Sequence, residues 1–293
     1  MKKILLFMLA LMLMVPTLSA EAASNESASK GKVLLVASST NTLTFTLTLK
    51  DGKVDPTGYF LDELAVPSMR LIKEGYQVVL ATPKGDIPVM DKVSNNVALF
   101  HGNQAALDEA LDFVQHDPVM LHPIKIKDAI AEGLDNYAAV YVPGGHAPMN
   151  DLMQDKDFGK VLRYFHETGK PTAFLCHGPI ASLAALDDPA GYRKALVSGT
   201  FDEQAEKSKN WQYAGYRMTI YSNAEEYSVE ENVLKGKLPF YVADALQIAG
   251  GIVEHAPLNE GHVVRDRELI TGQNPASDHM IAEELVNALA EKH

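Results

Sequence analysis

Cys176 is the only cysteine among the 293 residues, and its neighbours make it a candidate nucleophile. An apolar run at 171–175 leads directly into it, and His177-Gly178-Pro179 follows. A strand that turns sharply into a helix raises a nucleophile to the carboxyl edge of a parallel sheet, where amide groups and the helix dipole stabilise a thiolate. We therefore predict a reactive thiolate with a lowered pKa. The alternative is a cysteine that only packs in the core.

A second candidate corner follows the apolar run 138–142, where Gly144 and Gly145 precede His146. Ligands bind beyond the carboxyl ends of the strands in an open parallel sheet, so both corners are expected at one site. The glycines let a substrate approach the backbone, and their amides, with that of His177, form a predicted oxyanion site. A simple tight turn is the alternative. His146 has no second ligand at metal spacing, so we interpret it as pocket-lining and predict no metal.

Glu63 lies in the first turn of a predicted helix that spans residues 61–74. Most glutamates at this position face water and interact only with the helix dipole. Here the flanking residues Leu61, Leu64 and Val66 are apolar, which favours a carboxylate drawn into the pocket. Beside a thiol, such a carboxylate can hydrogen-bond the sulfur or shuttle protons.

The elements that must position these residues alternate between strand and helix. Continuous apolar runs predict strands covered on both faces, and helical spacing with glycine stops predicts the helices between them. The pattern predicts an α/β fold with a doubly wound, mostly parallel sheet sandwiched by helices. The predicted strands are 32–38, 77–81, 138–142, 171–175, 217–221 and 268–271, and the predicted helices are 61–74, 103–115, 157–168, 180–186, 239–249 and 274–290.

Two segments of the predicted single domain, residues 31–293, fit this alternation poorly. The strictly alternating run 42–49 reads as a half-buried strand or hairpin arm inside an excursion near 42–60. The polar stretch 201–216 shows no clear periodicity, so we expect an irregular surface excursion there. Both are predicted to form a lid or small lobe over the pocket.

The N-terminus predicts export. Residues 1–20 combine a basic start, a dozen apolar residues and a small-residue cleavage point after Ala20 or Ala23, which is typical of a secretory signal peptide. Residues 21–30 are interpreted as a flexible leader. We expect a periplasmic or secreted protein with no membrane attachment after cleavage. The formal charge of −12 argues against nucleic acid as a partner, because phosphate binding needs clustered positive charge.

Five blocks in order along the chain resemble the ThiJ/PfpI superfamily, which has the class I glutamine-amidotransferase-like (flavodoxin-like) fold. The most specific pair is Pro143-Gly144-Gly145-His146 with Cys176-His177-Gly178-Pro179. The other blocks are residues 58–67, 81–85 and 269–277. Within the superfamily, the chain is most similar to the branch of heat-shock chaperones and glutathione-independent, glyoxalase III-type enzymes.

The resemblance implies a role for each matching residue. Cys176 is the implied nucleophile, Glu63 its carboxylate partner, and His177 the imidazole of a Cys-His-acid triad. The acid is expected thirty to fifty residues beyond the cysteine, just after a strand. Glu226 is our choice there, with Glu225 as an unresolved rival.

The resemblance also implies a function, namely cysteine-dependent conversion of methylglyoxal to lactate by a lyase without glutathione or another cofactor. Cys176 would add to the aldehyde, and Glu63 or His177 would move the proton between the two carbons. Alternatives are a holdase that binds unfolded clients, a stress or redox sensor that oxidises at Cys176, and a small amidase or peptidase. A homodimer is the family expectation. The family usually has glycine where this chain has Ala147, a methyl group that could narrow the pocket.

Overall fold

A computed structural model describes residues 29–43 and 55–291. The predicted signal peptide (1–20), most of the predicted leader (21–30) and residues 44–49 of the alternating run lie outside the described residues. Of that run, Thr42–Leu43 form β2, which pairs antiparallel with β3 (Asp55–Pro56).

Seven strands form the central sheet, in the order β10-β11-β7-β6-β1-β4-β5. All neighbouring pairs are parallel except β10–β11, which is an antiparallel edge. The mostly parallel sheet confirms the predicted fold class. The strands are β1 (Lys32–Val36), β4 (Gln77–Thr82), β5 (Ile124–Lys125), β6 (Tyr137–Val142), β7 (Thr172–Leu175), β10 (Val263–Asp266) and β11 (Leu269–Gly272).

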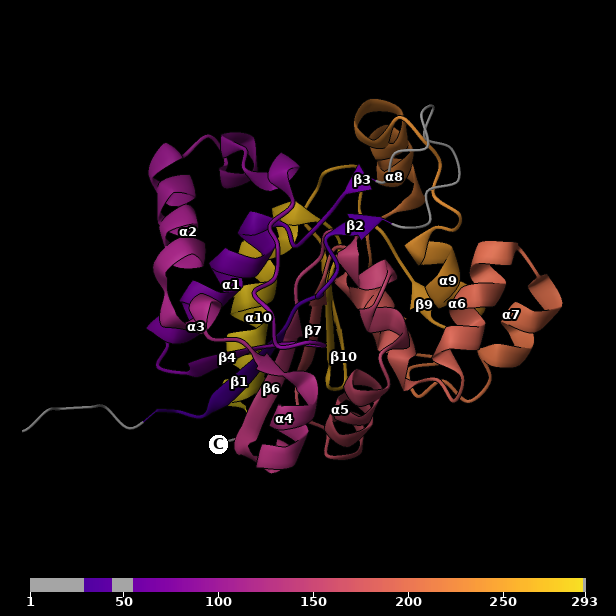
Figure 1. The fold of residues 1–293 in the computed structure, drawn as a ribbon, viewed down its shortest axis with the longest axis horizontal. Coiled ribbons are helices and arrows are strands. Elements are labelled where there is room, and N and C mark those ends of the chain that lie inside the picture. The colour runs from indigo at the N-terminus through magenta and orange to yellow at the C-terminus, as the bar shows by residue number, and fades with distance from the viewer. Residues whose placement is uncertain (1–28, 44–54, 292–293) are drawn as a thin grey trace, which may run out of the picture.

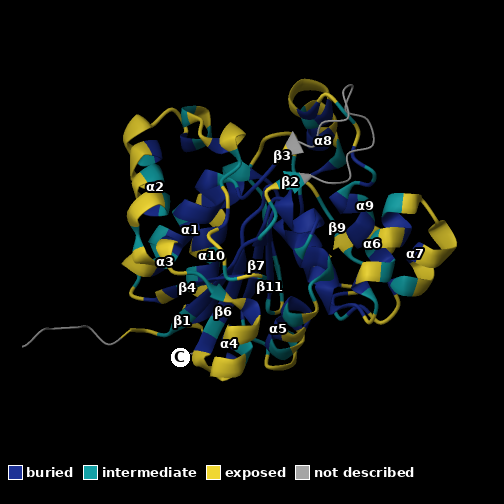
Figure 2. Cartoon of the chain, viewed as in Figure 1, coloured by how far each residue is buried: buried dark blue, intermediate teal, exposed yellow. Residues whose placement is uncertain are grey.

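Helices cover both faces of this sheet (Figure 1). On one side α1 packs against α2 and α10, and on the other α4 packs against α5. Buried residues gather along the strands and the inner helix faces, while the outer helix faces are exposed (Figure 2). The helices are α1 (Leu61–Lys73), α2 (Gln104–His116), α3 (Pro118–Leu121), α4 (Ile126–Glu132), α5 (Lys156–Glu167), α6 (Pro189–Ser198), α7 (Phe201–Lys207), α8 (Asn223–Val229), α9 (Val242–Ile248) and α10 (Asp278–Ala290).

β1 shows why these strands are apolar throughout. Successive side chains of a strand point to opposite faces of the sheet. Val33 and Leu35 accordingly join the hydrophobic cluster beneath α1 and α10, whereas Leu34 and Val36 join the cluster beneath α5. Both clusters bury these side chains almost completely, so neither face of the strand tolerates a polar residue.

Two sequence-based element predictions differ from the structure around the cysteine. The segment after it, Gly178–Ala185, is a 3-10 helix (η6) rather than the predicted α-helix. The predicted strand 217–221 shortens to β8 (Arg217–Met218), which pairs with β9 (Ile252–Val253) outside the main sheet. Beyond β8, the amide of Thr219 donates to the side-chain hydroxyl of Thr271 and not to a backbone carbonyl of a neighbouring strand, so the strand ends there.

The irregular structure predicted at 201–216 was wrong for its first part, which is a regular helix, although most residues of that helix are exposed as predicted. This helix is α7, which packs on α6, and buried Gln204 of α7 donates to the Ala195 carbonyl of α6. The second part of the segment buries Trp211, whose indole donates to the carbonyl of Ser182, and also two tyrosines. Seven helical residues with a single buried side chain carry too little apolar periodicity for the sequence to show a helix.

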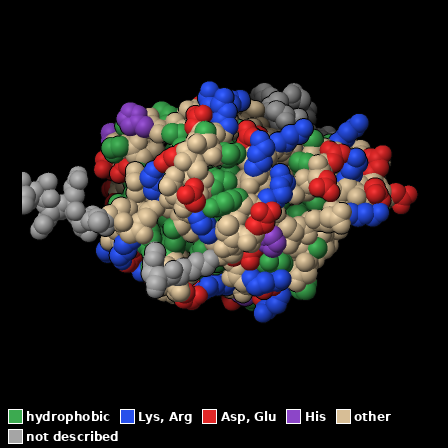
Figure 3. All heavy atoms as spheres, turned by 90° about the horizontal axis from the view of Figure 1, so that it is seen from below, with side chains coloured by type: hydrophobic (Ala, Val, Ile, Leu, Met, Phe, Trp, Pro, Cys, Tyr) green, Lys and Arg blue, Asp and Glu red, His purple; other side chains and the backbone are tan. Residues whose placement is uncertain are grey.

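On the face of the molecule drawn in Figure 3, basic and acidic side chains are interspersed among polar and apolar ones. Within the described residues, no helix combines the length and the apolar character that a membrane crossing requires.

Candidate active site

Cys176 occupies a strained corner directly after β7. Its φ of 60° lies in the left-handed region, which costs a non-glycine residue on the order of 1–3 kcal/mol. Two backbone bonds hold this conformation: the Cys176 amide donates to the Gly272 carbonyl at 2.9 Å, and the Tyr221 amide donates to the Cys176 carbonyl at 3.0 Å. The corner is therefore fixed by strand β11 and by the segment that leads to α8, as a nucleophile elbow requires.

Glu63 reaches this corner from the first turn of α1. Its side chain is fully buried, and its Oε2 accepts a hydrogen bond from the Gly144 amide at 2.8 Å. The carboxyl group also lies beside the Cys176 thiol. Burial raises the pKa of Glu63 to about 8, so this carboxyl group keeps its proton at neutral pH. A neutral carboxylic acid can donate a hydrogen bond to a sulfur that becomes negative.

His177 connects the sulfur to a carboxylate. Its Nδ1 lies 3.3 Å from Cys176 Sγ, and its Nε2 lies 2.6 Å from Glu226 Oε2. Burial works to raise the pKa of Glu226, but the two imidazoles beside it hold that pKa well below its usual range. Because ionised Glu226 only accepts hydrogen bonds, Nε2 carries the imidazole proton, and Nδ1 is left to accept one from the thiol.

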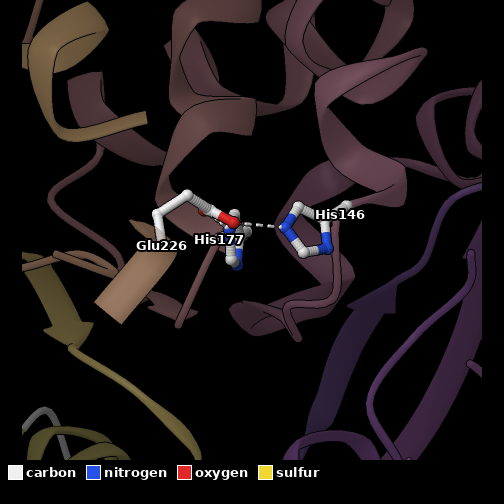
Figure 4. A group of neighbouring side chains, drawn as sticks. All are labelled: His146, His177 and Glu226. Atoms are coloured by element: carbon white, nitrogen blue, oxygen red, sulfur yellow. Dashed lines mark hydrogen bonds and ion pairs between the residues drawn. The ribbon is translucent and has the colours of Figure 1, made fainter. Parts of the chain in front are cut away.

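His146 binds the other oxygen of the same carboxylate. Its Nε2 lies 2.8 Å from Glu226 Oε1, so Glu226 bridges the two histidines (Figure 4). Burial alone would lower the pKa of His146, but the nearby acids, Glu226 first and then Asp91, together outweigh burial and raise it. Burial and the nearby His146 charge both lower the pKa of His177. These directions favour the protonated form of His146 and a neutral His177, which is able to act as a base beside the ionised Glu226.

The rival acid Glu225 faces away from His177. It forms a capping box with Ser222 at the start of α8 and accepts further hydrogen bonds from the Gln273 and Asn274 side chains. Its carboxylate therefore joins α8 to the end of β11. The structure brings Glu226 to the imidazole and places Glu225 in a supporting network.

These residues meet at a cavity of about 210 Å³. Cys176, His177 and His146 line it together with the charged residues Asp91 and Lys92. Tyr221 packs against the His177 ring in a tilted arrangement, with centroids 4.6 Å apart. A larger and more open hollow of about 1030 Å³ lies between α1, α2 and α10. None of the reactive residues lines that hollow in the described part of the chain, so we place the candidate site at the smaller cavity.

A model of the DJ-1/PfpI family matches residues 58–288, which span the elements that build this site. The chain belongs to the DJ-1/PfpI family. It is 25% identical over 250 residues to the protein/nucleic acid deglycase HchA of Pseudomonas aeruginosa (strain UCBPP-PA14), covering 83% of this chain and 77% of the relative. It is 27% identical over 274 residues to the protein of that name from Staphylococcus aureus (strain JH9), covering 90% and 82%.

The structure is also similar to the crystal structure of glyoxalase III (Orf 19.251) from Candida albicans. The TM-score is 0.67 at 23% identity, and the match covers 88% of this chain and 97% of the other. A similar match, with a TM-score of 0.67 at 19% identity, is the 24 kDa Rapid Encystment Protein of Francisella tularensis, covering 88% and 99%. At sequence identities of 19% and 23%, these structural similarities are evidence for a shared fold.

Neighbouring atoms lie so close to both glycines of the second corner in this DJ-1/PfpI chain that a side chain at either position would collide with them. A Cβ at Gly144 would lie 2.5 Å from Glu63 Oε2 and 2.7 Å from Cys176 Cβ. Gly145 has a φ of 84°, and a Cβ there would lie 2.0 Å from the Gly58 carbonyl oxygen. Ala147 is fully buried and is not among the described residues that line the cavity, so its methyl group does not narrow it.

The expected lowering of the Cys176 pKa is not what the surroundings produce. Burial raises the pKa of this thiol, and the carboxylates of Glu225 and Glu226 raise it further. The corner and His177 favour a thiolate, but the residue pattern does not show how completely folding excludes water from the sulfur or how close it brings these acids. A thiol of this kind keeps its proton at rest, so a nucleophilic role would require a base to remove that proton.

The interpretation of His146 as a residue with no metal partner nearby also needs correction. The fold places ligand atoms of His146, His177 and Glu226 within 4.8 Å of one another, a group that could hold a metal ion. No sequence spacing shows this, because the three residues come from separate loops and from α8. In the structure each carboxylate oxygen instead pairs with one imidazole.

Sequence reasoning missed two buried acids behind the site. Both carboxyl oxygens of Asp62 are buried with no hydrogen-bond partner among the described residues. Burial, then Glu63 and then Asp278 raise the pKa of Asp62, and burial raises that of Asp278. The Asp62-Glu63 pair in an apolar helix start was the only signal in the sequence, and Asp278 lies more than two hundred residues away.

Proposed function

We propose that this DJ-1/PfpI protein is an enzyme that uses Cys176 to convert small 2-oxoaldehydes such as methylglyoxal to 2-hydroxy acids without glutathione. The proposal rests above all on the His177 ring, whose Nδ1 faces the sulfur at 3.3 Å while Nε2 faces Glu226 at 2.6 Å. Relatives named deglycase HchA and a structural neighbour named glyoxalase III support chemistry on reactive carbonyls.

The first step joins sulfur to the aldehyde carbon. As the Cys176 sulfur forms its bond to C1, the thiol proton passes to His177 Nδ1, and Glu226 stabilises the imidazolium. The protonated carboxyl of Glu63 stabilises the charge that develops on sulfur. His177 then returns its proton to the C1 oxygen. The product is a neutral hemithioacetal.

The second step moves hydrogen from C1 to C2. A base removes the C1 proton while the C2 oxygen takes up a proton, which gives an enediol. The base then returns its proton to C2 as the C1 hydroxyl loses its own, which leaves a carbonyl at C1 and a hydroxyl at C2. C1 is oxidised and C2 is reduced, so no external oxidant is needed. His177 lines the cavity and Glu63 does not, which favours His177 as this base. Water then cleaves the resulting thioester, and Cys176 regains its proton as the hydroxy acid leaves.

We also propose that the protein is exported, because residues 1–20 are predicted to be a signal peptide. Its supporting observation is the basic, apolar and small-residue order of that segment. The periplasmic or secreted location, the homodimer, and the holdase, redox and amidase alternatives stay predictions.

The proposal is tested by incubating the purified protein with methylglyoxal in the absence of glutathione and measuring lactate. We expect Cys176→Ser to reduce turnover to the uncatalysed background. Glu226→Gln, which leaves His177 without its carboxylate, is expected to lower kcat at least about a hundredfold. Glu231→Gln is the matched control, because Glu231 is exposed on the same helical segment. Normal turnover by Cys176→Ser would show that the proposal is wrong.

A further inference from the structure

The cavity at Cys176 has one reactive wall and one apolar wall. Its volume of about 210 Å³ is several times the roughly 30 Å³ that a water molecule occupies in the liquid. The apolar wall consists of Phe60, Val93, Val229, Val233 and Leu234, and the charged residues Asp91 and Lys92 also line the cavity. Methylglyoxal offers this wall a single methyl group. Most of the apolar surface would then stay in contact with water.

The apolar wall and the proposed triad acid are carried by one continuous helical segment. Glu226 lies in the first turn of α8, Val229 one turn further on, and Val233 another turn beyond that. Residues three, four and seven apart share a helix face, so the carboxylate and the valines point to the same side. The segment 230–234 is a π-helix, a rare conformation that occurs frequently at functional sites.

A buried glutamate fixes the far end of this wall. Glu230 accepts hydrogen bonds from the Leu238 amide at 2.7 Å, from Lys237 Nζ at 2.6 Å and from the Tyr241 hydroxyl at 3.0 Å. These bonds tie the π-helix to the chain that follows it. The wall is therefore pre-formed, and a ligand that fills it does not have to order it first.

We infer that the site selects 2-oxoaldehydes whose ketone carbon carries a branched or aromatic apolar substituent over methylglyoxal. The inference rests on the proposed function and adds the substrate class. The dicarbonyl end faces Cys176 and His177, while the substituent covers Val229 and Val233 and displaces water from them. An apolar contact of one methylene in an enzyme pocket discriminates at least about tenfold. We therefore expect kcat/KM for isobutylglyoxal to exceed that for methylglyoxal by about tenfold or more.

The experiment compares kcat/KM for methylglyoxal and isobutylglyoxal, two alkyl 2-oxoaldehydes of similar carbonyl reactivity. Val233→Asp places a charge on the wall at a side chain that is 50% exposed, so the fold tolerates it. We expect it to lower the ratio of kcat/KM for isobutylglyoxal to kcat/KM for methylglyoxal about tenfold. Val233→Ala is expected to lower the isobutylglyoxal value about threefold. Asn232→Asp adds the same charge at the exposed neighbouring position, which does not line the cavity, and is expected to change neither.

Two kinds of failure are distinguishable. If wild-type protein turns over neither aldehyde faster than Cys176→Ser does, the proposed function fails and the substrate class fails with it. If both aldehydes are turned over but methylglyoxal is the equal or better substrate, the selectivity alone is refuted. Equal losses for both aldehydes in Val233→Asp would likewise show that this wall does not contact the substituent.

Discussion

Replacing Glu63 by glutamine is expected to make the protein more stable at alkaline pH. Burial raises the pKa of Glu63 from 4.5 to about 8. Between these values the unfolded chain releases a proton that the folded protein keeps, so wild-type stability falls as pH rises and levels off above about pH 8. Glutamine cannot ionise, and its side-chain oxygen can still accept the hydrogen bond from Gly144.

The size of the effect follows from the pKa. Each tenfold change in an acid dissociation constant corresponds to about 1.4 kcal/mol, so a rise from 4.5 to about 8 sets an upper limit of roughly 5 kcal/mol. Local rearrangement around an ionised Glu63 reduces this value. We expect the difference in unfolding free energy, Glu63→Gln minus wild type, to increase by roughly 2–4 kcal/mol between pH 5 and pH 8.5.

The assay is urea unfolding at a series of pH values, with both proteins in a Cys176→Ser background. The serine removes thiol oxidation and the titration of the neighbouring sulfur. Exposed Glu231→Gln serves as the control and is expected to show no such trend. A difference that stays constant with pH, or that decreases toward alkaline pH, would refute a protonated Glu63 in the folded protein.

Two further substitutions test the rest of the site. His146→Ala removes the positive charge that lowers the pKa of His177, so the acidic limb of the kcat/KM profile is expected to move to higher pH. On that limb kcat/KM falls about tenfold for each pH unit by which the limb moves. His146→Gln can keep a hydrogen bond to Glu226 and is expected to lose less; an unmoved limb in the alanine variant would contradict the charge effect. Gly144→Ala is expected to destabilise the protein by about 1–3 kcal/mol in urea unfolding, because its Cβ would lie 2.7 Å from Cys176 Cβ. Unchanged stability would contradict the close approach.

The sequence alone was sufficient for the fold class and for the position of the cysteine corner. Buried parallel strands are apolar on both faces, so β1, β4, β6 and β7 stand out as short runs. A cysteine directly after such a run falls at the carboxyl edge of the sheet. Local patterns failed where stability depends on distant partners, as at β8, which pairs with β9 more than thirty residues later, and at α7, which packs on α6.

The charge state of the site was decided by the tertiary structure. Glu63, His146 and Glu226 are separated by about eighty residues each, and no spacing rule reveals that one carboxylate bridges two imidazoles. The same contacts reverse the expected direction of the Cys176 pKa, because burial and acids from other elements outweigh the local effect of the corner. Residue types along the chain identify which groups can react, whereas their protonation depends on solvent exclusion and on neighbours brought together only by folding.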